Sequence, residues 1–131
     1  MLTTRKELLL GHRDSDGPTS AYLRAADGIL STPLFKNSAR KAKFLRFVVE
    51  EAVLNNDIKE VTIGIEIFRH DYDPAVHSDV RVAAREVRKM LRKYYRSEGR
   101  NAEVLITLPA KGYRPSFFIA ESSPLARLAA D

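Results

Sequence analysis

The chain has 131 residues, a length that fits one domain plus tails. Folding buries roughly two thirds of the surface of such a chain, which is enough to hold a core without a metal or a disulfide. The sequence contains no cysteine, which excludes disulfides, cysteine zinc sites and thiol nucleophiles. No apolar run approaches the ~20 residues that span a membrane, and the apolar stretch near the first residue is too short for a signal peptide. We therefore expect a soluble, cytoplasmic protein.

Basic charge is concentrated in one segment. Lys and Arg number 22 against 17 Asp and Glu, which gives a net charge of +5. Residues 78–100 include eight basic and three acidic side chains, so this window holds the whole excess. A clustered positive field attracts a polyanion more strongly than scattered charge does. The distribution therefore favours nucleic acid as a partner.

The first helix is expected over residues 21–30. It follows residues 1–17, which are predicted to be a flexible leader because residues 11–17 contain several turn-forming Gly, Asp and Ser. The apolar side of this helix either completes the core or offers a contact surface for a homodimer. Its members include Tyr22, Leu23, Ala26, Ile29 and Leu30.

A second helix is expected behind Ser38, a good N-cap residue. Residues 43–54 place Phe, Leu, Val and Ala at helical spacing. The β-branched residues at 58–61 then predict a short strand. Thr62 is expected to cap a short helix over residues 63–68.

The longest periodic segment runs from Ser78 to about Arg96, with Ser78 or Asp79 as its cap. One stripe of this helix is apolar and the other is basic, so the helix is amphipathic. The apolar stripe contains Val80, Ala83, Ala84, Val87, Leu91 and Tyr94, and the basic stripe contains Arg81, Arg85, Arg88 and Arg92.

A β-hairpin is predicted after this helix. Residues 104–108 form its first strand, Gly112 takes a positive φ in the turn, and residues 113–119 return, with Tyr113 packing the hairpin onto the long helix. Residues 121–131 are expected to be a tail or linker. The order of elements predicts one α+β domain over residues 18–120. It is a winged helix-turn-helix, with a three-helix core, a C-terminal β-hairpin wing and an extra N-terminal helix.

Four motifs follow one another in the second half of the chain. They are DYD at 71–73, VRVAAREVRKML at 80–91, ITL at 106–108 and GYR at 112–114. In their order and spacing, residues 58–117 resemble the effector domain of OmpR/PhoB-type response regulators. The resemblance implies a bacterial winged helix that binds double-stranded DNA in transcription regulation. It also implies that Arg88 is a structural pairing residue.

A longer stretch, residues 29–117, more closely resembles the amino-terminal winged-helix module of large soil-bacterial (acidobacterial-type) proteins. Two features depart from the response-regulator pattern. Helix-like sequence stands where that family has a small amino-terminal sheet, and no receiver domain fits, so the resemblance does not imply control by phosphorylation. The family often has Arg at the wing position that is Pro109 here, although Lys111 and Arg114 supply charge nearby.

The long basic helix is the candidate for reading DNA. The major groove of B-DNA admits one α-helix, and Arg can donate two hydrogen bonds to guanine. We expect base contacts from the start of this helix, at Ser78, Arg81 and Arg85. Contacts with phosphates, or internal pairs, are expected further along the helix, at Arg88, Lys89 and Arg92. Weaker phosphate candidates, on the wing and at the start of the earlier helix, are Lys111, Arg114, Lys41 and Lys43.

Other interpretations of these residues stay open. The basic stripe could be a solvated helix face, or it could meet an acidic protein in an interaction or signalling adaptor module on the same scaffold. The aromatic residues near the end could stack on single-stranded bases. Residues 70–79 hold two His and three Asp, but at no strong metal-ligand spacing.

No catalytic motif stands out, so we expect a protein that is not an enzyme. We expect no metal, no cofactor, no membrane contact and no small-molecule ligand. The expected partners are double-stranded DNA and, as an option, a second copy of the chain in a homodimer.

Overall fold

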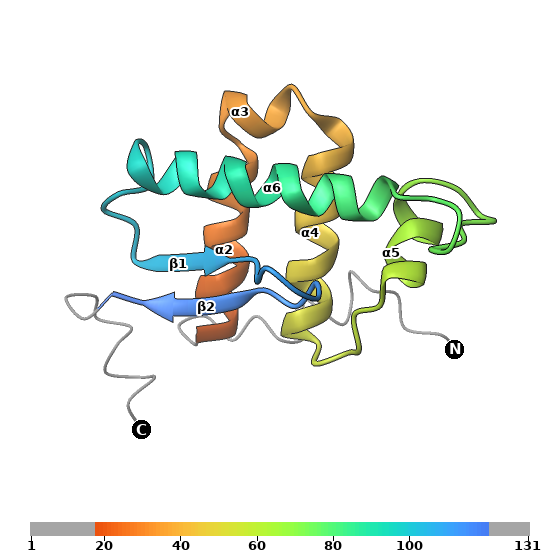
Figure 1. The fold of residues 1–131 in the computed structure, drawn as a ribbon. Coiled ribbons are helices and arrows are strands. Elements are labelled where there is room, and N and C mark those ends of the chain that lie inside the picture. Colours follow the sequence, from red (N-terminus) through yellow and green to blue (C-terminus); the bar gives the residue numbers. More distant parts are fainter. Residues whose placement is uncertain (1–17, 121–131) are drawn as a thin grey trace.

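The computed structural model describes residues 18–120, so the leader predicted at 1–17 and the tail predicted at 121–131 lie outside the described residues. The fold is α+β, as expected (Figure 1). Within residues 18–120, no helix is long and apolar enough to cross a membrane. The elements, in chain order, are α2 (Pro18–Leu30), α3 (Pro33–Lys36), α4 (Ala39–Val53), α5 (Glu60–Ile67), α6 (Asp79–Arg96), β1 (Val104–Thr107) and β2 (Ser116–Ile119).

The helices α2 and α4 lie side by side, and α6 crosses both of them (Figure 1). α5 packs against α4 and against α6 at the end where α6 begins. The β1–β2 hairpin runs alongside α6 and packs through β1 on α2. This arrangement leaves one long side of α6 uncovered by any other helix or strand of residues 18–120.

The hydrophobic core lies between these helices and the hairpin. The apolar stripe predicted for α6 is confirmed, except that Tyr94 is only half-buried and Met90 joins the buried set. From α2, Ile29 and Leu30 are buried against the same core. They therefore complete the core of this chain, which is one of the two roles that the sequence left open for this helix.

The hairpin is antiparallel, with Val104 opposite Ile119 and Leu105 opposite Phe118. Gly112 has φ 80°, which confirms the positive φ predicted for the turn. The returning strand begins at Ser116 rather than at residue 113. Pro115 stands directly before Ser116 and has no N–H to donate to the other strand.

Two local predictions are wrong. Residues 58–61 were expected to be a strand, but α5 already begins at Glu60, three residues before the predicted helix start at residue 63. A lone short strand would have had no partner for its backbone groups, whereas the helix buries Ile63 and Gly64. The segment after α2 also contains a short helix that we did not predict, α3, whose first residue is a proline with a suitable fixed φ.

The serines predicted to cap two helices occupy the N-cap positions without capping through their side chains. Neither Ser38 nor Ser78 makes a side-chain cap hydrogen bond. At α6, the N–H of Val80 instead donates to the Tyr72 hydroxyl, at 3.1 Å. A side chain from the preceding loop therefore satisfies an N–H group at the start of the helix.

Candidate nucleic-acid interface

One row of side chains follows the uncovered side of α6. We call this row the α6 outer face, and it consists of Ser78, Val82, Arg85, Lys89 and Arg92, all exposed. Their spacing alternates between four and three residues, as one face of a helix requires. This row shares Arg85 and Arg92 with the predicted basic stripe. The other two members of that stripe, Arg81 and Arg88, have partners within the protein.

The arginines of the outer face are available for an external partner. Neither Arg85 nor Arg92 forms a hydrogen bond or ion pair with any residue of 18–120. The Lys89 Nζ lies 4.0 Å from a carboxylate oxygen of Glu86. An exposed ion pair of this kind contributes little to stability. The outer face therefore presents positive charge that the described residues do not neutralise.

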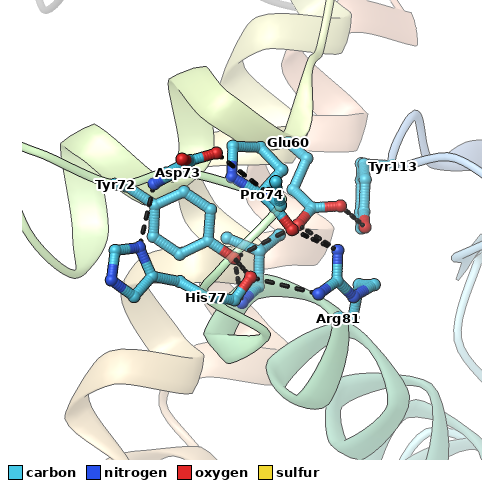
Figure 2. Close-up of polar contacts among 9 residues, drawn as sticks. Glu60, Tyr72, Asp73, Pro74, His77, Arg81 and Tyr113 are labelled. Carbon is cyan, nitrogen blue, oxygen red and sulfur yellow. Dashed lines mark hydrogen bonds and ion pairs between the residues drawn. The ribbon is translucent and has the colours of Figure 1, made fainter.

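Arg81 donates to three acceptors near the start of α6 (Figure 2). Its Nη1 lies 2.8 Å from Oε2 of Glu60 and 3.2 Å from the Pro74 carbonyl oxygen. Its Nη2 lies 3.1 Å from the His77 carbonyl oxygen. The guanidinium thereby ties α6 to α5 and to the loop between them. Arg81 was predicted to read a base, and in this conformation its donors point at the protein.

Glu60 receives hydrogen bonds from several parts of the chain (Figure 2). Besides Arg81, the Tyr72 hydroxyl lies 3.2 Å from its Oε2, and the Tyr113 hydroxyl donates to its Oε1 at 2.9 Å. One carboxylate thus joins α5, the α5–α6 loop, α6 and the hairpin. Burial, and next the bond to Glu60, raises the pKa of Tyr113 to about 12. The Tyr113 hydroxyl therefore attaches the hairpin to α5, and its ring meets Phe44 of α4 edge-on.

The position of Tyr72 depends on a glycine. A Cβ at Gly64 would lie 2.1 Å from the Tyr72 ring, so only glycine lets the ring approach α5 this closely. Burial raises the pKa of Tyr72 above its usual value. The ring is thus fixed against α5 while its hydroxyl reaches the start of α6.

Arg88 fastens the hairpin turn to the middle of α6. Its Nε donates to the Pro109 carbonyl oxygen at 2.7 Å, and its Nη2 lies 3.5 Å from that of Gly112. These contacts fit the structural role that the resemblance implied, and they hold the turn that carries the exposed Lys111 beside α6. At the other side of the turn, Arg114 donates to the carbonyl oxygen of Asn56, between α4 and α5.

The remaining phosphate candidates lie apart from the hairpin turn. Lys41 is half-buried and Lys43 is exposed, and both belong to the first turns of α4. That end of α4 and the hairpin turn lie on opposite sides of α6 (Figure 1). The structure therefore does not gather these two lysines with Lys111.

The His- and Asp-rich segment before α6 forms turns. Asp73 accepts the N–H of Ala75 at 2.9 Å, and its own N–H donates to Nδ1 of His77 at 2.9 Å. Arg69 binds Asp71 at 2.6 Å, and this hydrogen bond lowers the pKa of the Asp71 carboxyl. Among residues 18–120, no three His, Asp or Glu side chains are grouped as a metal site would need.

Most aromatic rings near the C-terminal end of the domain have partners within it. Tyr22 and Phe117 stack at 4.2 Å, and Tyr94 meets Tyr95 edge-on at 4.9 Å. Phe118 is the exception among these rings, because it is 56% exposed. A single exposed ring provides no row of rings for successive bases.

Comparison of the chain with protein-family models, with curated proteins and with solved structures found no match. The chemistry of the site is therefore the basis for assigning a function. Sequence reasoning missed two residues of this site. The helical spacing of Val82 from Ser78 and Arg85 could have identified it, whereas no local pattern points to Glu60.

Proposed function

We propose that the protein binds double-stranded DNA as a winged helix-turn-helix regulator, or as the DNA-binding module of one. In this proposal α6 is the recognition helix and the β1–β2 hairpin is the wing. The observation that carries it is the α6 outer face, a row of unneutralised cations on a helix whose other face is buried. The major groove admits one such helix. The motif resemblance to OmpR/PhoB-type domains supports the same conclusion.

The residues of this surface take different roles. Arg85 reads a guanine through two hydrogen bonds, and Ser78 contacts a base near the start of the helix. Lys89, Arg92 and Lys111 bind phosphates, which position the protein on the duplex.

The other basic residues of the helix and wing hold these groups in place. Arg88 and Arg114 anchor the wing through backbone carbonyl oxygens. Arg81 fixes the start of α6 through its bond to Glu60. Since their donors are engaged within the domain, we assign these three residues to positioning rather than to DNA.

Fluorescence anisotropy with a randomised duplex pool, at several salt concentrations, tests this function. Three phosphate contacts predict that log Kd rises with log salt with a slope of about 3, since each contact contributes about 0.9. Sequencing the retained DNA should give an enriched motif. Absence of duplex binding at low salt, by a protein that circular dichroism shows to be folded, would overturn the proposal.

One surface favours a second candidate function, that of an interaction module for an acidic protein. A groove of ≈ 260 Å³ lies between the second half of α6 and β1. Its lining includes the buried Leu91 and Leu108 and the basic side chains of Arg88, Arg92 and Arg96. This combination suits an apolar segment that carries carboxylates. A folded protein that binds no duplex but binds acidic amphipathic peptides would establish this alternative.

A further inference from the structure

One exposed residue of α6 differs in chemistry from all the others. Every other exposed residue in this helix, which lies wholly within the described part of the chain, is charged, whereas Val82 is apolar and 42% exposed. It belongs to the α6 outer face, four residues after Ser78 and three before Arg85. Its methyl groups are therefore part of the surface that we propose enters the major groove.

The guanidinium of Arg81 does not occupy the surface around Val82. Arg81 precedes Val82 in the chain, but Glu60, Pro74 and His77 hold its guanidinium toward α5 and the loop (Figure 2). Between Ser78 and Arg85, the outer face thus offers a hydrocarbon group and no hydrogen-bond donor.

Resting on the proposed function, we propose that Val82 is a specificity-determining residue that contacts the 5-methyl group of a thymine. That methyl group is the apolar feature that an A·T pair, unlike a G·C pair, presents in the major groove. Three residues of α-helix span about 4.5 Å, close to the ~3.4 Å between successive bases of a strand. Val82 and Arg85 therefore read neighbouring base pairs, and the bound sequence contains a thymine next to a guanine.

Replacing single thymines by deoxyuridine in the selected duplex tests this inference, because only the 5-methyl group is removed. We expect one position at which the wild type loses about fourfold in affinity, the value for one buried methyl group. Val82→Ala should bind the thymine duplex more weakly and lose nothing further on deoxyuridine substitution there. Val61→Ala, the same change at a 37% exposed position on α5, is the matched control and should behave as wild type.

The outcomes separate this inference from the proposed function. Specific binding with no thymine in the motif, or with equal deoxyuridine losses in the wild type and Val82→Ala, would overturn the role of Val82 and leave DNA binding standing. Absence of any duplex binding at low salt would overturn both.

Discussion

The Tyr113 hydroxyl donates a hydrogen bond of 2.9 Å to Oε1 of Glu60, although the two residues are 53 positions apart. The other oxygen of the same carboxylate accepts from Arg81 at 2.8 Å. The hairpin and the first turn of α6 are therefore held by one side chain of α5, and a change at this carboxylate affects both.

Glu60→Gln is expected to lower the free energy of unfolding by about 1–3 kcal/mol, because it weakens the hydrogen bonds of a charged side chain that is only 17% exposed. Urea denaturation followed by circular dichroism measures this change. Glu66→Gln, on the exposed side of the same helix, is the control and should change little. Equal effects of the two substitutions would contradict the role given to Glu60.

Two helical glycines predict opposite effects of the same substitution. Gly64→Ala drives a Cβ into the Tyr72 ring, at 2.1 Å, and should destabilise the protein by about 1–3 kcal/mol. In α2, Gly28→Ala meets no atom within 4 Å and should stabilise it by about 0.5–1 kcal/mol, because alanine favours the helix. Thermal unfolding of both variants measures the difference. A Gly64→Ala protein as stable as Gly28→Ala would show that the Tyr72 ring is not packed as described.

Alkaline pH should destabilise the fold. Burial raises the pKa of Tyr95 and of Tyr113 from 10.0 to about 12, so the folded state holds these protons more tightly than the unfolded chain does. Their contribution to stability is complete below pH 10.0 and is lost as the pH rises toward about 12.

Denaturant titrations between neutral pH and pH 12 measure this loss. Tyr95→Phe should be less stable at neutral pH, since Tyr95 bonds the Val104 carbonyl oxygen and the Ile106 N–H, and it should lose less stability at high pH. A folded protein whose tyrosines all ionise near pH 10.0 would contradict the prediction.

The wing residues predict separable effects on DNA binding and stability. Lys111→Ala should weaken binding to all sequences about equally, lower the salt slope by about one and leave stability unchanged. Arg88→Ala should weaken binding similarly, because it frees the turn, and should also lower the melting temperature. Anisotropy at several salt concentrations and thermal melting measure the two effects. If Arg88→Ala left stability intact, the bond to the Pro109 carbonyl oxygen would not anchor the wing.

The parts of the fold that depend on local patterns could be predicted from the sequence. The period of the apolar residues placed α6 and its buried stripe, and Gly112 marked the turn. The hydrogen-bond partners of Arg81 and Arg88 could not be predicted, because helical spacing shows only that both residues belong to the basic stripe. Their long side chains reach acceptors 21 residues away that only the folded chain brings near. The role of Glu60 could not be predicted either, because its partners Tyr72, Arg81 and Tyr113 are distant in sequence.

The ratio of affinities for a selected duplex and for an unrelated duplex, compared between the wild type and Arg85→Ala, tests the proposed function most directly. We predict that Arg85→Ala lowers this ratio about tenfold, because a bidentate contact to guanine supplies sequence discrimination. Arg24→Ala, an exposed arginine of α2, should leave it unchanged. An unchanged ratio for Arg85→Ala, including the case in which both duplexes lose affinity equally, would contradict base reading by the outer face of α6.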